Sequence, residues 1–231
     1  MKNQLTKENV DHLFTFVKSK YVHWEDVQYE IVDHLASSIE DVQEENPNIG
    51  FEEGLRKVYS KFPITGFTNL VAAKEKAVYR YWLRRVGIYM LQFFELPRVI
   101  FTLFLGLSIF SFLTLMPEKG PEILHILVSI ILVFFFFVKR KTARFMKENN
   151  QFLVVRSLFD ITQTSVVLAF VFPVNMMMGD YSIGSNIHAA QIAILFTLLL
   201  LFDYASTYHF PEMLREEVEE KYSHLKINLA N

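Results

Sequence analysis

The chain has 231 residues, of which 52% are apolar and 23 are Phe. This apolar share exceeds that of ordinary soluble domains and indicates a membrane protein, while the length leaves room for one folded domain besides a membrane part. The absence of Cys excludes disulfides, thiolate metal sites and thiol nucleophiles. The net charge of −2 hides an asymmetry: residues 1–53 hold four Lys and twelve Asp or Glu, a net −8, and residues 54–98 hold nine Lys or Arg and two Glu, a net +7.

Residues 1–66 have the pattern of a helical domain. Thr6 is the expected N-cap of a first helix that runs to about Lys20. A second helix follows over Trp24–Glu45, and a turn containing Pro47 separates it from a short helix over Phe51–Lys61. The N-terminal residues have neither the apolar core nor the cleavage site of a signal peptide, so we expect this domain in the cytoplasm.

The second helix carries eight acids and no Lys or Arg. At 100° per residue its apolar residues form one stripe, and a set of acids lies on the opposite side. We expect this acidic face to bind a protein partner, with simple solvation as the structural alternative. The residues of the acidic face are Asp26, Glu30, Asp33, Glu40 and Glu44.

His34 and Glu30 are the candidates for a metal site, since they lie one helical turn apart. There is no HExxH motif and no repeated ExxH, and a histidine hydrogen-bonded to Glu30 accounts for the same pattern. No glycine-rich phosphate loop or nucleophile elbow occurs either. We therefore expect no enzymatic activity and no cofactor, and keep a membrane-bound metalloenzyme as an alternative.

We expect residues 67–98 to form a juxtamembrane helix in which basic and aromatic side chains are mixed, a composition that suits the membrane interface. Residues 99–204 then contain four apolar segments that we expect to span the bilayer, at about 99–116, 121–138, 157–178 and 186–204. The loop 139–151 has five basic residues and the loop 179–186 has none, which predicts that both termini are cytoplasmic. Residues 205–231 contain an amphipathic tail helix with Pro211 near its start.

Polar residues within the apolar segments mark two further candidate sites. Near the cytoplasmic end lie Arg156, Asp160, Gln163 and Asp203, which could join two helices or form an ion or proton site. Near the outer end lie Asn175, His188 and Gln191, which could line a small pocket or be ordinary interfacial residues. The first group supports an alternative function, that of a small transporter or channel subunit.

Two motifs in residues 21–62 carry a resemblance to a known family. The segment EIVDHLASSIEDV, a polar break and the segment FEEGLRKVYSKF resemble the HAAS-type helical domains of bacterial membrane proteins. His34 and Leu35 match the first motif and residues 52–55 the second, where Gly54 replaces the usual alanine. The resemblance implies a signalling role beside PadR-like transcription regulators, without catalysis.

We therefore expect an all-α protein with a cytoplasmic helical domain, a four-helix transmembrane bundle and a C-terminal amphipathic helix. The expected function is that of a bacterial inner-membrane signalling or accessory protein. Its expected partners are the lipid bilayer and a cytoplasmic regulatory protein, such as a PadR-like regulator, without direct nucleic-acid binding. Whether the chain forms a homo-oligomer stays open.

Overall fold

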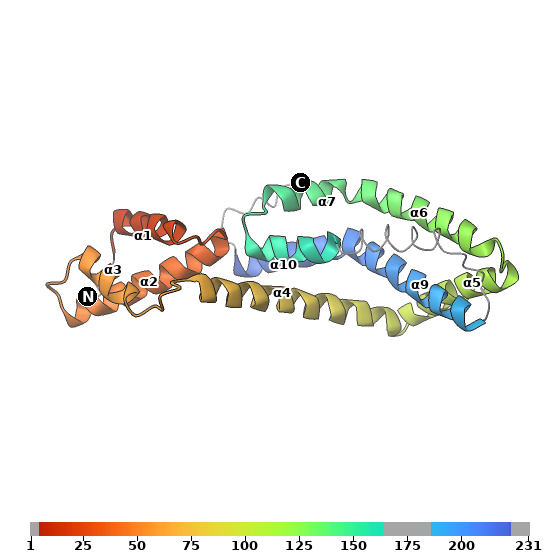
Figure 1. The fold of residues 1–231 in the computed structure, drawn as a ribbon, viewed down its shortest axis with the longest axis horizontal. Helices are drawn as coiled ribbons and strands as arrows, with labels where there is room; N and C mark the ends of the chain where they lie inside the picture. The colour runs from red at the N-terminus through yellow and green to blue at the C-terminus, as the bar shows by residue number, and fades with distance from the viewer. Residues whose placement is uncertain (1–4, 164–185, 223–231) are drawn as a thin grey trace. The chain divides into compact units, whose positions relative to one another are not determined.

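The structure is a computed structural model that describes residues 5–163 and 186–222. These residues contain helices and no strand, which confirms the all-α class (Figure 1). The chain divides into two compact units. The first unit comprises residues 1–80 together with 149–157, and the second comprises residues 81–148 and 158–231. The first unit thus extends beyond the expected boundary at residue 66 and takes in a segment from much later in the chain.

Three helices begin the first unit: α1 over Lys7–Ser19, α2 over Glu25–Glu45 and α3 over Phe51–Tyr59. Thr6 caps α1, because its hydroxyl accepts a hydrogen bond from Asn9 N at 3.3 Å, as the sequence predicts. α2 packs against both α1 and α3. The apolar stripe of α2 lies in the core, and its members are all at least 95% buried: Val27, Ile31, Leu35, Ile39 and Val42.

The close packing of α2 and α3 depends on Gly54. A Cβ atom at this position would lie 3.2 Å from Cγ2 of Ile39, which is tighter than an ordinary carbon contact. Gly54, which has no Cβ atom, therefore lets α3 approach α2 closely. Residues 149–157 complete this unit: Glu25 N donates to Gln151 O at 2.9 Å, and Phe152 and Val155 are buried.

Among the described residues six more helices follow α3, besides a 3₁₀ turn over Gln92–Phe94 and a helical stretch at 153–163. They are α4 over Thr68–Leu91, α5 over Arg98–Leu115, α6 over Gly120–Val138, α7 over Arg140–Glu148, α9 over Asn186–Tyr208 and α10 over Phe210–Lys221. The division between the units falls inside α4. In the second unit α5 packs along α9, and α6 contacts both. Buried apolar residues join them: Ile109, Leu113, Leu124, Val128, Ala189, Ala193 and Phe196.

The expected spans compare well with these helices where the structure describes them. α5 and α6 begin one residue earlier than predicted, and α9 continues four residues beyond 204. Of the third segment, residues 157–163 are helical and the remainder lies outside the described residues. Two described helices, α5 and α9, are long and apolar enough to cross a bilayer. Core helices of soluble proteins can have the same length and composition.

Candidate functional site

The acidic face of α2 is only partly open to solvent. Asp33 and Glu44 are exposed. Glu40 is half-buried and accepts a hydrogen bond from Leu5 N at 3.2 Å. Glu30 forms an ion pair with Lys74 of α4, with 2.5 Å between Oε2 and Nζ. The residues of this face that remain open to a partner are therefore Asp33 and Glu44, which lie about 20° apart on the helix.

Asp26 differs from the expectation for the acidic face, because it is buried rather than exposed. Its carboxylate accepts hydrogen bonds from Leu153 N at 2.9 Å and Val154 N at 3.0 Å, at the start of the helical stretch 153–163. It also accepts one from Val27 N at 3.1 Å. Burial raises the pKa of Asp26, and the backbone hydrogen bonds only partly offset this. Asp26 therefore acts as an internal cap within the first unit.

His34 is exposed on α2, and Glu30 on the preceding turn is engaged by Lys74. Among the residues that the structure describes, no group of three or more His, Cys, Asp or Glu side chains could hold a metal ion. The two metal candidates therefore have no third ligand of these kinds beside them in this part of the chain.

The polar group of Arg156, Asp160, Gln163 and Asp203 is spread over both units. Arg156 is half-buried in the first unit, whereas Asp160 and Gln163 are exposed in the second. Asp203 is buried in α9 and forms an ion pair with Lys139, with 2.6 Å between Oδ1 and Nζ. Lys139 directly follows α6, so this buried ion pair joins the ends of α6 and α9.

The polar group expected at the outer end of the spans is described only in part. His188 and Gln191 are exposed on the first turns of α9. Asn175 lies outside the described residues, so the expected outer pocket cannot be placed.

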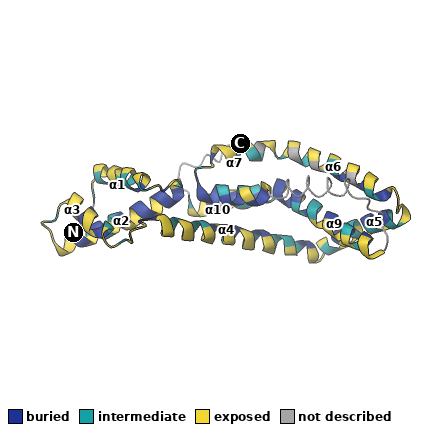
Figure 2. Cartoon of the chain, in the orientation of Figure 1, coloured by how far each residue is buried: buried dark blue, intermediate teal, exposed yellow. Residues whose placement is uncertain are grey.

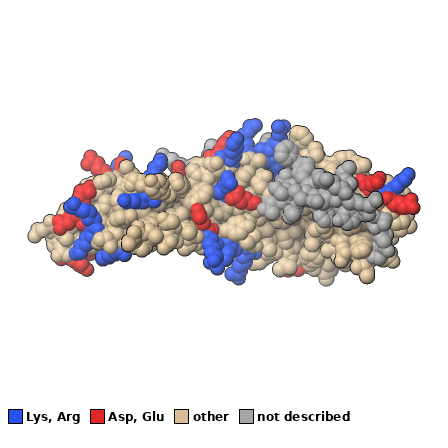
Figure 3. Space-filling model, in the orientation of Figure 1, with Lys and Arg blue, Asp and Glu red and all other residues tan. Residues whose placement is uncertain are grey.

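Apolar side chains are exposed over much of α5, α6 and α9, as the yellow positions along these helices indicate (Figure 2). Only 17% of the 18 residues of α5 are buried. On the face shown in Figure 3, charged side chains gather at the two ends of α6 and are sparse along its length. The exposed apolar residues include Ile100, Phe104, Leu107, Ile126, Ile130, Phe134, Ile194 and Leu198.

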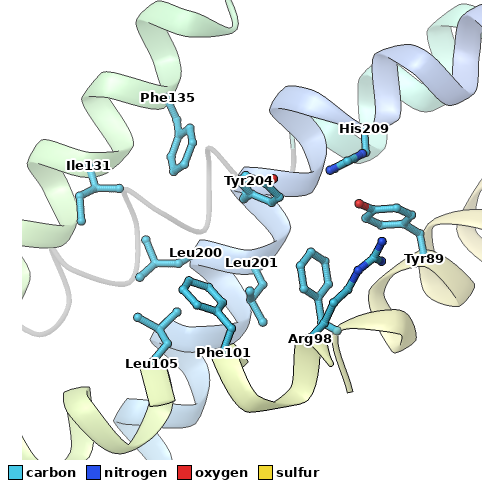
Figure 4. A pocket seen from close by; sticks show the side chains of 11 residues that line it. Tyr89, Arg98, Phe101, Leu105, Ile131, Phe135, Leu200, Leu201, Tyr204 and His209 are labelled. Carbon is cyan, nitrogen blue, oxygen red and sulfur yellow. The ribbon is translucent and has the colours of Figure 1, made fainter. Parts of the chain in front are cut away.

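A partly open cavity of about 560 Å³ lies at one end of these three helices (Figure 4). Its polar side chains are Tyr89, Arg98, Tyr204 and His209, and the rest of its wall is apolar. The ring of His209 lies 4.9 Å from that of Tyr89 and 5.6 Å from that of Tyr204. Burial raises the pKa of Tyr89, and the charge of the nearby Arg98 opposes this.

A separate charged cluster holds α10 on α4 within the second unit. Glu217 is buried and accepts hydrogen bonds from Tyr81 and from Arg85 Nη1, the latter at 2.7 Å. Lys221 Nζ lies 2.9 Å from its other oxygen. Burial would raise the pKa of Glu217, but the hydrogen bonds from Tyr81 and Lys221 and the charges of Lys221 and Arg85 outweigh it and lower the pKa. The sequence predicted an amphipathic helix in this segment but not the role of this carboxylate.

The structure thus yields an exposed acidic pair on α2, a large apolar surface and an amphipathic cavity. The sequence did not identify the cavity, because its polar residues come from three separate stretches of the chain. The only sequence signal was the cluster of Tyr, Arg and His at the ends of the apolar segments. None of the family models, curated proteins or solved structures compared with this chain matches it.

Proposed function

We propose that the protein is a bacterial inner-membrane signalling or accessory protein whose first unit binds a regulatory protein in the cytoplasm. The proposed membrane insertion is supported by the exposed apolar surface of α5, α6 and α9. Apolar surface in water costs about 25 cal/mol per Å², and monomeric soluble proteins rarely expose contiguous apolar patches beyond a few hundred Å². A bilayer offsets this cost, and the third expected segment would complete a four-helix bundle.

Basic residues at the helix ends support the cytoplasmic orientation. Arg98 begins α5, and Lys139 and Arg140 follow the last residue of α6. The start of α5 and the end of α6 would then both face the cytoplasm under the positive-inside rule. In the first unit, residues 1–80 precede α5 and residues 149–157 follow α7, so both parts are proposed to be on that side.

The acidic pair Asp33 and Glu44 is the proposed contact for the partner. Both are exposed, and about 16 Å of helix separates them, a length suited to a basic helix or strand of another protein. Opposite charge would accelerate association and make it sensitive to salt. The resemblance to HAAS-type domains supports a PadR-like regulator as the partner.

The test is recovery of partners on full-length protein solubilised in mild detergent. We expect the double variant Asp33→Lys and Glu44→Lys to lose most of the bound regulator, whereas Glu8→Lys with Asp11→Lys, exposed acids on α1, should retain it. Glu30 and Asp26 are left unchanged, because both are engaged inside the unit. Equal recovery on both double variants would exclude the acidic pair as the contact.

A further inference from the structure

The cavity of the second unit combines a polar end with an apolar interior. In Figure 4 the side chains of Arg98, Tyr89 and His209 lie on one side, and those of Leu105 and Ile131 lie on the other. Arg98 is the first residue of α5, and Leu105 lies seven residues further, a rise of about 10 Å along the helix. The cavity therefore runs from the helix ends about two turns along the apolar segments.

Arg98 is positioned to bind an anion at the polar end. One of its nitrogens donates to Gln92 Oε1 at 2.8 Å, and its guanidinium lies 5.9 Å from the ring centroid of Tyr89. Among the described residues Arg98 forms no ion pair, and Glu212 Oε2 lies 3.9 Å from His209 Nδ1. A guanidinium has five N–H donors, so those not used by Gln92 remain available to a phosphate group.

The apolar part of the cavity suits an acyl chain. Its wall includes Leu105, Ile131, Phe135 and Leu200 from three different helices, and Phe101 at its edge is 61% exposed. An exposed aromatic side chain beside the opening would contact lipid in a bilayer. The volume of about 560 Å³ is in the range of pockets that bind small ligands.

We propose that this cavity binds one anionic glycerophospholipid of the cytoplasmic leaflet, with the phosphate at Arg98 and Tyr89 and part of an acyl chain against Leu105 and Ile131. The proposal rests on the membrane insertion of α5, α6 and α9 proposed above. It goes further by identifying a specific lipid site, where the proposed function requires only general contact with the bilayer.

The test is native mass spectrometry of the full chain in mixed micelles containing phosphatidylglycerol and phosphatidylcholine with the same acyl chains. We expect the unaltered protein to retain one phosphatidylglycerol in preference. Arg98→Gln should reduce this binding about tenfold, since a charge-assisted contact is lost, and Arg98→Lys should restore part of it. Leu105→Trp should reduce lipid retention by filling the apolar end. Arg84→Gln, on an exposed position of α4 outside the cavity, is the matched control and should have no effect.

Equal retention of the two lipids, or unchanged retention in Arg98→Gln, would overturn the proposal. Competition by glycerol 3-phosphate as effective as that by the whole lipid would also overturn it, because it would reduce the site to an anion site. A carbonate wash of membranes separates the two proposals. A chain that stays in the membrane but lacks lipid preference contradicts the cavity alone, whereas a chain released by the wash contradicts membrane insertion itself.

Discussion

At the scale of single residues, Asp26 joins two stretches of chain that are 127 residues apart. It lies in the first turn of α2, and its carboxylate accepts hydrogen bonds from the first backbone amides of the helical stretch 153–163. The N-terminal ends of both helices thus share one negative charge, which both helix dipoles favour. Leu153 and Val154 are themselves buried, so their amides have no access to water as an alternative partner.

Asp26→Ala should therefore destabilise residues 149–157 by about 1–3 kcal/mol, the usual cost of a buried donor without a partner. Asp26→Asn should cost less, because the amide oxygen still accepts. Hydrogen exchange of the solubilised full chain, followed by mass spectrometry of the segment 152–156, would measure this. Asp33→Ala on the same helix is the control, and equal protection in Asp26→Ala and the control would contradict the capping role.

At the scale of elements, α10 is held on α4 by the buried carboxylate of Glu217. Tyr81 and Arg85 on α4 and Lys221 on α10 surround it. Because the folded state lowers the pKa of Glu217, the folded state holds the proton less tightly than the unfolded chain does. The stabilisation is therefore fully present above the unfolded pKa and is lost as the pH falls through the folded pKa.

The attachment of α10 should accordingly weaken in acid. The chain has no Cys, so a single Cys at the exposed position of Glu220 can carry a nitroxide spin label. We expect the label to become more mobile as the pH is lowered below about 4.5, starting from a restricted state at neutral pH. Glu217→Gln should remove most of this pH dependence, and a pH response that persists in this variant would assign it to other groups.

At the scale of the whole molecule, the proposed orientation predicts which loops are reached from outside the cell. Glu118 lies between α5 and α6, and Arg144 lies on α7, and both are exposed. A membrane-impermeant maleimide should label a Cys at position 118 in intact cells but should label a Cys at position 144 only after permeabilisation. The reverse pattern would indicate the opposite topology. Labelling of both positions in intact cells would contradict the proposal that α6 spans the membrane.

Periodicity and turn residues predict most helices of this chain within a few residues, because a helical stripe is a local property of the sequence. The apolar stripe of α2 and the Thr6 cap both follow in this way and are confirmed. The projection of α2 at 100° per residue nevertheless placed Asp26 on the solvent side. It could not include residues 149–157, which cover that end of α2 in the folded unit.

The amino-acid pattern alone was thus enough for the all-α class, the bounds of most helices and the large apolar content, since each depends on neighbours within a few turns. It did not predict α7, which lies in the expected loop 139–151, or the end of α4 at Leu91. Tertiary contacts decided which polar groups are free. Lys74 engages Glu30, Lys139 engages Asp203, and the backbone at residues 153 and 154 engages Asp26. The physical reason is that a buried charge is stabilised by the particular donors that folding brings to it, and those donors come from distant positions in the chain.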